Sequence, residues 1–190
     1  MKTAVLIILS IAIIIGVIVM LNRLDDGIKY ETYSSRNKNL NIVIDYISGW
    51  ESRERGGEQG LVIFIEPKQD QADFSANISV MAQAQTEPLS IGAEAEKVLN
   101  KRLKLKDARV IAQTKRKLLA QQAVDLELAH KGLNQLYSTE AKLIPMKERI
   151  IVLQKYGKLF TIRYMNREEE FSKYDKAFYH CLKTLRPKTP

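Results

Sequence analysis

The first pattern in the chain is a nearly continuous run of apolar residues close to its amino terminus. The run extends from Ala4 through Leu9 and Ile14 to Leu21 and contains no charged residue. At about 1.5 Å per residue it would form a helix about 27 Å long, which nearly matches the hydrocarbon core of a bilayer. A buried helix of a soluble protein rarely runs this long without a polar face. The pattern therefore predicts a transmembrane helix over residues 1–24.

The same segment lacks the features of a cleaved export signal. Its apolar stretch is longer than that of a cleaved signal, and no pair of small residues follows it. We therefore expect an uncleaved signal anchor in the membrane lipid bilayer. Basic residues after the segment favour a cytoplasmic domain under the positive-inside rule: Arg23, Lys29, Arg36 and Lys38. Because a short basic head is typical of export and large domains translocate largely regardless of charge, we expect the domain on the exported (periplasmic or extracytoplasmic) side.

Alternation of apolar and polar residues predicts the strands in the first half of the chain. Residues 25–38 are polar and are expected to form a tether. Apolar residues then occupy every second position over residues 40–46, as in a strand with one apolar face. Residues 53–60 are charged and rich in glycine and are expected to form an exposed loop. The apolar stretch 61–65 and the alternating stretch 77–83 are predicted strands.

A helix and four more strands are predicted next. Ser90 can cap the helix by accepting a backbone N–H, and apolar residues recur at helical spacing up to Leu103. The four strands are predicted over residues 109–117, 122–130, 137–155 and 158–165. Glycine turns at Gly132 and Gly157 would join them, and Pro145 indicates a bulge or a sheet edge.

The last segment has the pattern of a capped helix. Asn166 can cap it, and Glu169 can reach back to the N–H of the cap residue. An apolar stripe begins at Phe171, and Pro187 ends the helix. Strands, a helix, more strands and a final helix indicate an α+β domain over residues 39–187, in which an antiparallel β-sheet packs against helices.

The order of these elements resembles the PsbP-like family, as does the pair Tyr46 and Trp50 after the first alternating strand. This family includes extrinsic subunits of the photosynthetic oxygen-evolving complex, a Ran-binding nuclear-transport factor and uncharacterised bacterial proteins. The resemblance covers residues 38–186 and implies a non-enzymatic module that binds or supports a membrane complex. Two features depart from the family: Ile47 stands where a proline often occurs, and a membrane segment replaces the long extension of the plant subunits. The resemblance therefore implies the fold without the photosystem role.

Composition and single residues place few constraints on chemistry. The net charge of +8 permits anionic partners, and one cysteine excludes an internal disulfide. Cys181 falls on the apolar stripe and is interpreted as a small core residue. Its neighbour His180 points about 100° away along the helix, so the two cannot hold one metal ion. Because no catalytic, phosphate-binding or metal-binding motif occurs, we predict no enzyme activity and no cofactor.

Two other features have structural interpretations. The three glutamates at residues 168–170 suit the positive end of a helix dipole, which explains them more simply than a cation site does. Trp50 follows a turn in a chain with one tryptophan, and we expect it to fill the end of the core rather than to serve as an exposed binding anchor.

Two groups of basic residues form the candidate surface for an anionic partner. The first group is Lys101, Arg102, Lys104, Lys106 and Arg109, and the second is Lys115, Arg116 and Lys117. Near a bilayer, each favourable cation contributes about 1 kcal/mol against anionic headgroups. The structural alternative is a solvated helix face together with lysines that protect a sheet edge. No aromatic residue is interleaved with these basic residues, so no nucleic-acid partner is expected.

These patterns favour a membrane-anchored, non-enzymatic accessory domain on the exported side. It would contact a membrane-associated protein complex or a lipid surface. The alternative is a cytoplasm-facing adaptor or chaperone for membrane proteins, because basic residues follow Leu21. A third possibility is an unrecognised hydrolase or metal protein built on the charged loops.

Overall fold

The structure is a computed structural model that describes residues 27–57, 59–68, 74–85, 90–134 and 141–188. Its strands are β1 (Tyr30–Ser34), β2 (Ile42–Ile47), β3 (Glu51–Arg55), β4 (Gly60–Ile65), β5 (Asn77–Ala84), β6 (Arg109–Leu118), β7 (Gln121–Leu133), β8 (Leu143–Lys155), β9 (Lys158–Arg167) and β10 (Arg186–Pro187). Its helices are α2 (Ile91–Arg102), the 3-10 helix η1 (Glu168–Tyr174) and α3 (Asp175–Thr184).

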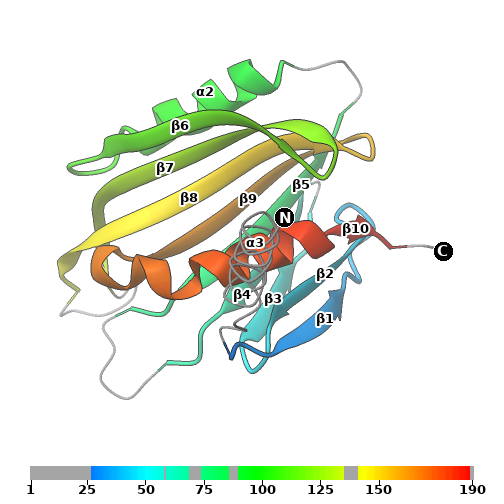
Figure 1. Ribbon diagram of the computed structural model, residues 1–190, viewed down its shortest axis with the longest axis horizontal. Helices are drawn as coiled ribbons and strands as arrows, with labels where there is room; N and C mark the ends of the chain where they lie inside the picture. Colours follow the sequence, from blue (N-terminus) through cyan, green and yellow to red (C-terminus); the bar gives the residue numbers. More distant parts are fainter. Residues whose placement is uncertain (1–26, 58, 69–73, 86–89, 135–140, 189–190) are drawn as a thin grey trace, which may run out of the picture.

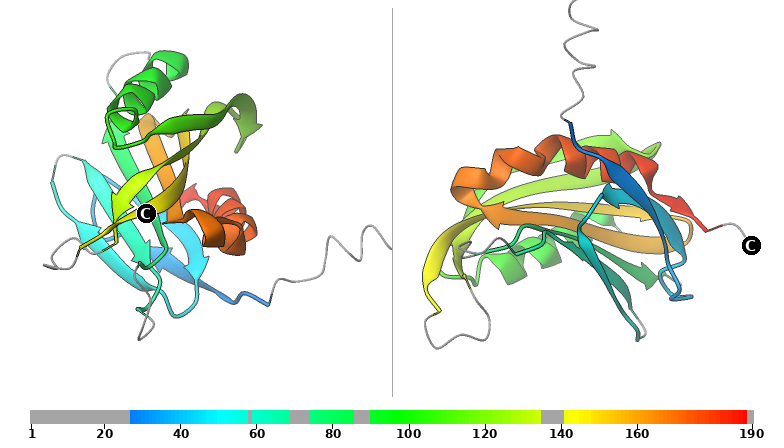
Figure 2. Two further views of the ribbon diagram at one scale, coloured as in Figure 1. Left: turned by 90° about the vertical axis from the view of Figure 1, so that its left-hand side faces the viewer. Right: turned by 90° about the horizontal axis from the view of Figure 1, so that it is seen from below.

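The strands form two antiparallel sheets, and helices pack on them (Figure 1). The larger sheet has the order β3-β4-β5-β9-β8-β7-β6, and the smaller sheet has the order β1-β2-β10. The segment from η1 to α3 lies on one face of the large sheet, and α2 lies on the other face (Figure 2). The predicted α+β class, an antiparallel β-sheet packed against helices, is confirmed.

The start of the folded domain differs from the sequence prediction. Strand β1 pairs with β2 along its whole length, and the Ser48 backbone N–H donates to the Lys29 carbonyl at 2.8 Å. The predicted tether over residues 25–38 is therefore wrong for residues 30–34, which form strand β1 of the small sheet. The predicted transmembrane segment, residues 1–24, lies outside the described residues. Within the described ranges, no helix is both long and apolar enough to cross a membrane.

The main core lies between the two sheets and the segment from η1 to α3. Phe64, Tyr164 and Phe178 are among its largest fully buried side chains. The predicted apolar stripe of the last segment faces this core: Phe171, Tyr174, Phe178, Cys181, Leu182 and Leu185. Trp50 is 6% exposed and meets the ring of Tyr174 edge-on, with the ring centres 5.0 Å apart, as expected for a core residue. Each large apolar side chain buried in this way contributes about 1.5–3 kcal/mol.

Helix α2 covers the other face of the sheet through a smaller core. The Ser90 hydroxyl accepts the backbone N–H of Ala93 at 3.4 Å, which confirms the predicted cap. Ala95 is the single buried residue of α2, while Val98 and Leu99 are partly buried against β7 and β8. This helix therefore rests on much less apolar area than α3 does.

Two segments that were predicted as a loop and a turn are parts of strands. Residues 51–55, which overlap the predicted loop 53–60, form β3, whose charged side chains are mostly exposed and hide the strand pattern. Gly132 lies inside β7, opposite a residue of β8, instead of in a hairpin turn. A Cβ atom at Gly132 would lie 3.0 Å from the Met146 side chain, so this glycine permits close packing.

Two other predictions about turns and edges are confirmed. Tyr156 and Gly157 join β8 to β9, and their φ angles of 54° and 68° fit a tight hairpin turn. Pro145 pairs with β7, but the pairing of β8 with β9 begins one residue later, at Met146. Pro145 therefore lies where β8 is locally an edge strand. An edge position tolerates proline, because no neighbouring strand there requires a backbone N–H from it.

The predicted capped helix at the carboxyl end is two elements, and its predicted cap is wrong. Asn166 belongs to β9, where its amide donates to the Glu170 carbonyl at 3.1 Å and its side-chain oxygen accepts the Arg167 N–H at 2.8 Å. The 3-10 helix η1 follows without a side-chain cap, and α3 begins at Asp175. Pro187 does not directly end α3, because it pairs with β2 in the short strand β10.

Candidate functional site

The candidate basic residues divide according to side-chain type. Each arginine forms an ion pair: Arg102 with Glu148 at 3.3 Å, Arg109 with Glu168 at 2.8 Å, and Arg116 with Asp125 at 2.8 Å. The lysines are exposed, and their side chains form no hydrogen bond or ion pair with a described residue: Lys101, Lys104, Lys106, Lys115 and Lys117. The arginines are therefore paired with acids of the same chain, and the lysines are left without such partners among the described residues.

The available lysines do not form one patch. Lys101, Lys104 and Lys106 lie at the end of α2 and before β6, whereas Lys115 and Lys117 lie near the far end of β6. A strand rises about 3.3 Å per residue, so the two groups are separated by about 20 Å along β6. A single small anion cannot contact both groups.

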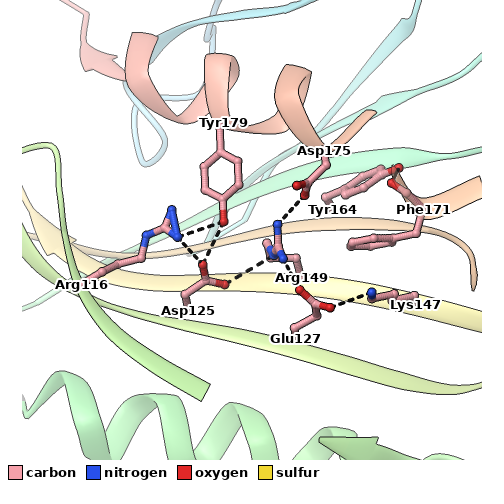
Figure 3. Close-up of polar contacts among 9 residues, drawn as sticks. All are labelled: Arg116, Asp125, Glu127, Lys147, Arg149, Tyr164, Phe171, Asp175 and Tyr179. Carbon is pink, nitrogen blue, oxygen red and sulfur yellow. Dashed lines mark hydrogen bonds and ion pairs between the residues drawn. The ribbon is translucent and has the colours of Figure 1, made fainter. Parts of the chain in front are cut away.

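A second cluster of charged residues lies between the large sheet and α3 (Figure 3). Glu127 of β7 lies directly opposite Arg149 of β8, and their side chains form an ion pair. Arg149 also pairs with Asp175 at the start of α3, and its Nε atom lies 3.7 Å from an oxygen of Asp125. The Lys147 ammonium lies 2.7 Å from Glu127. We define the Arg149 network as Arg116, Asp125, Glu127, Lys147, Arg149, Asp175 and Tyr179.

Aromatic side chains of η1 and α3 contact the charged residues of this network. The Tyr179 hydroxyl donates to Asp125 at 3.0 Å, and Arg116 donates to the same carboxylate at 2.8 Å. The Arg116 guanidinium lies 4.6 Å from the centre of the Tyr179 ring, and the Lys147 ammonium lies 4.8 Å from that of Phe171. Such cation–π contacts contribute about 0.5–2 kcal/mol each, depending on desolvation. The network thus fastens η1 and α3 to the sheet.

The electrostatics of the network favour a structural role. Burial alone would raise the pKa of Glu127, but hydrogen bonds from Lys147 and Arg149 outweigh it and lower that pKa below its ordinary value of 4.5. Burial and the nearby Asp125 carboxylate raise the pKa of Tyr179 to about 12. Both pKa values move away from neutral pH, whereas general acid–base catalysis uses groups with pKa values near the working pH. The formal charges of the three acids and three bases also cancel.

The opposite face of the sheet contains a buried carboxylate in a different setting. Glu148 is fully buried, and three cationic or basic groups surround it: Arg102 at 3.3 Å, His130 at 3.9 Å and Arg163 at 3.9 Å. Neither oxygen of Glu148 and neither ring nitrogen of His130 forms a hydrogen bond with a described residue. A buried polar group without such a partner costs about 1–3 kcal/mol. Because Arg102 lies in the last turn of α2, its ion pair with Glu148 attaches this helix to the sheet by charge attraction without a hydrogen bond.

A hollow of about 440 Å³ lies between the start of β8 and residues 167–169. Its charged side chains already have ion-pair partners in the chain, because Arg167 pairs with both Glu169 and Glu170, and Glu168 pairs with Arg109. The glutamates of η1 thus bind arginines of the same chain. Among the described residues that line the hollow there is no serine, cysteine or histidine that could act as a nucleophile or base.

Cys181 and His180 are neighbours in α3 but have different surroundings, and His130 lies in β7. Cys181 is buried, and burial raises the pKa of its thiol to about 12, which confirms its interpretation as a small core residue. The His180 ring stacks on Tyr30 with centres 3.9 Å apart, and its Nε2 atom lies 3.6 Å from Asp45. His130 lies on the other face of the sheet. Across the described ranges, no three histidine, cysteine or acidic side chains are grouped so as to hold a metal ion.

Sequence reasoning does not identify the Arg149 network. The alternation over residues 122–130 assigns Asp125 and Glu127 to a polar strand face, without showing that η1 and α3 cover this face. A usable signal is the spacing of the charges: two acids lie two positions apart, as do the cations Lys147 and Arg149. These pairs come together only when β7 and β8 are aligned in register.

Comparison by sequence finds no matching family model and no matching curated protein. Comparison by structure finds proteins of similar fold that cover most of the chain. Cyanobacterial PsbP (CyanoP) of Synechocystis sp. PCC 6803 has a TM-score of 0.55 at 15% identity, over 83% of this chain and 92% of that chain. LpqN of Mycobacterium tuberculosis has a TM-score of 0.52 at 12% identity, over 85% and 92% of the two chains.

A eukaryotic protein has the same architecture. The Ran-binding protein Mog1p of Saccharomyces cerevisiae has a TM-score of 0.50 at 8% identity, over 85% of this chain and 97% of that chain. At these identities the likeness concerns the fold alone. The fold that the sequence resemblance implied is therefore confirmed: this chain has the PsbP-like fold.

Proposed function

We propose that this protein is a membrane-anchored, non-enzymatic accessory domain that faces the exported side and contacts a protein of a membrane complex. The observation that carries the proposal is the uncharged apolar run from Ala4 to Leu21, which is followed closely by the folded domain. Since β1 begins at Tyr30, the anchor would hold the domain close to the surface of the bilayer.

The charged residues of the domain support a non-enzymatic role. The acids of the Arg149 network are bound by cations of the same chain and fasten α3 to the sheet. The hollow beside β8 is lined by residues whose charges are already paired. LpqN, a protein of the same fold, is involved in cell envelope biogenesis, which agrees with a location in the envelope.

The extent of the folded domain supports the exported orientation. Lys29, Arg36 and Lys38 favour a cytoplasmic domain when they are counted as a flank of the membrane segment. Lys29 directly precedes β1, and the other two lie in the turn between β1 and β2. Charges within a large domain affect the orientation of a membrane segment less than charges in a short flank do. Of the basic residues after the apolar run, Arg23 alone lies before the folded domain, so the case for a cytoplasmic domain is weaker.

The direction in which the chain enters the domain supports a protein partner over lipid at the exposed lysines. The first described residues lie on the side of α3, and α2 lies on the opposite side of the molecule (Figure 2). An anchor attached before Gly27 would therefore direct the α2 side away from the bilayer. Lysines on that side would meet soluble or protruding partners sooner than lipid headgroups.

Membrane fractionation of cells that express the full chain tests the anchor. A double variant, L9R/I14R, places two arginines near the middle of the apolar run, where each costs about 2.5–3.5 kcal/mol of insertion free energy. The matched control L9I/I14L keeps the run apolar. We expect the unchanged chain and the control to stay in the membrane pellet after an alkaline wash, and L9R/I14R to leave it. Full-length unchanged chain in the soluble fraction would overturn the proposal.

A further inference from the structure

The outermost strand of the large sheet, β6, is exposed over most of its length. Every residue from Arg109 to Lys115 is exposed, so neither face of this stretch is covered. Val110 and Ile111 are 42% and 44% exposed. Apart from β7, no described part of the chain hydrogen-bonds to the β6 backbone. The strand thus presents free backbone donors and acceptors beside apolar side chains, which is a template for strand addition.

The opposite edge of the same sheet is shorter and partly covered. Strand β3 has five residues, whereas β6 has ten. The turn between β1 and β2 lies against β3: the Asn37 side chain donates to the Arg55 carbonyl at 3.1 Å. The Asn37 backbone N–H also donates to the Glu54 carboxylate at 2.7 Å. These contacts occupy part of the outer side of β3, so β6 is the more accessible edge of the large sheet.

The charges on β6 define the kind of strand that it can accept. The strand contains four basic residues and no acidic residue. Arg109 and Arg116 are paired within the chain, which leaves Lys115 and Lys117 available. The ladder with β7 places these two lysines on the same face of the sheet, two positions apart. They oppose pairing with a second copy of β6, which is equally basic, and attract a strand with acidic residues at alternate positions.

We propose that β6 binds an extended, acidic peptide segment of a partner protein by adding it to the edge of the large sheet. Acidic residues of the segment face Lys115 and Lys117, and apolar residues lie beside Val110 and Ile111. Ile111 has no partner on β7, because a bulge interrupts the ladder there. Main-chain hydrogen bonds supply affinity and the alternate side chains supply specificity. This inference rests on the proposed function, because it names the surface through which the accessory domain meets a protein partner.

A labelled peptide titrated against the purified full chain in nonionic detergent tests this inference. The probe is as long as β6, ten residues. It alternates threonine with glutamate in its first half and threonine with valine in its second half. A control peptide has lysine in place of each glutamate. We expect the acidic probe to bind and the basic peptide to bind at least about tenfold more weakly, because like charges on paired strands are destabilising.

Two charge-reversal variants of the chain locate the binding site. K115E/K117E changes β6, and the matched control K101E/K104E makes the same change of charge at the end of α2. We expect the first to weaken binding of the acidic probe about tenfold and the second about twofold or less. Hydrogen exchange followed by mass spectrometry should show slower exchange in β6 with the probe bound, and unchanged exchange in β3. An equal loss in both variants, or no added protection in β6, overturns the inference.

Lipid is tested as the competing ligand in the same assay. Phosphatidylglycerol added to the detergent micelles should leave probe binding to β6 unchanged. Displacement of the probe by this anionic lipid overturns the assignment to a peptide. The two proposals fail separately: a chain that lacks peptide binding can still fractionate with membranes, and a soluble chain can still bind the probe.

Discussion

The two faces of the large sheet carry buried charges in different ways. On the α3 face, Arg149 makes direct contact with acids of both β7 and α3, and aromatic rings cover the cations. On the α2 face, Glu148 is fully buried, but neither of its oxygens accepts a hydrogen bond from a described residue. The apolar contacts differ in the same direction, since α3 buries Phe178 and Leu182 whereas α2 buries only Ala95.

This difference shows which side of the molecule is the scaffold. A buried charge is retained at low cost when hydrogen-bonding partners replace water, and otherwise its desolvation penalty remains. The α3 face therefore supplies most of the stability, together with the main core. Helix α2 rests on less buried apolar surface, and the neighbouring strand β6 is exposed from Arg109 to Lys115, which suits a surface that receives a partner.

The largest expected effect is a difference in stability loss between variants of the two apolar cores, one on each face of the sheet. F178A should lower the free energy of unfolding by about 3–5 kcal/mol, because Phe178 is fully buried in the main core. L99A removes a partly buried side chain of α2 and should cost about 1–2 kcal/mol. Urea unfolding of the full chain in nonionic detergent, followed by the fluorescence of Trp50, measures both. Equal costs would show that α2 is packed as firmly as α3.

A smaller effect separates the two buried carboxylates. E127Q removes the charged acceptor of Lys147 and one of the carboxylates that bind Arg149, and it should cost about 2 kcal/mol. E148Q removes a charge that accepts no hydrogen bond from a described residue, and the partners Arg102 and Arg163 are partly exposed, so water can solvate them. Its cost should therefore stay below about 1 kcal/mol, or stability should rise. The same unfolding assay applies to both variants. A larger loss for E148Q than for E127Q would reverse the comparison.

The pH dependence of stability sharpens this contrast. Because the pKa of Glu127 is lower in the folded protein than its ordinary value of 4.5, its contribution is complete above that pH. The contribution is lost as the pH falls through the lowered value, where the folded carboxylate becomes protonated. Between pH 5 and pH 3 the unchanged chain should lose stability more steeply than E127Q does, as measured by urea midpoints. Parallel curves would remove Glu127 as a source of acid sensitivity.

The smallest expected effect concerns the cap of α2. S90A removes the hydroxyl that accepts the Ala93 N–H and should cost about 1 kcal/mol or less. Hydrogen exchange should increase in the first turn of α2 and stay unchanged in α3. Faster exchange throughout both helices would contradict the view that α2 is only weakly joined to the rest of the fold.

The elements that could be predicted from the sequence are those with a regular apolar period. Strands β2, β4, β5 and β9 have buried residues at alternate positions, and α2 has both a helical stripe and a capping serine. Strands β1 and β3 lack this signal because they lie at sheet edges and keep polar or charged residues. The sequence also gives no signal for the break between η1 and α3, because the apolar stripe continues from Phe171 through Leu185.

The candidate site was less predictable than the fold, because it depends on which strands are neighbours. The eight basic residues can be found in the sequence, but their division into paired arginines and available lysines cannot. Arg116 meets Asp125 across the β6–β7 ladder, and Arg109 meets Glu168, which is distant in sequence. The hairpin between β6 and β7 also gives no signal, because Leu119 and Ala120 adopt the positive φ angles that usually favour glycine or asparagine.

The central claim is that an anchored domain faces the exported side, and a pair of fusions to the carboxyl end of the full chain tests it most directly. One fusion carries alkaline phosphatase, which is active only after export, and the other carries a green fluorescent protein that matures only in the cytoplasm. We expect phosphatase activity in the membrane fraction and no fluorescence. Fluorescence without phosphatase activity would contradict the account and favour the cytoplasm-facing adaptor.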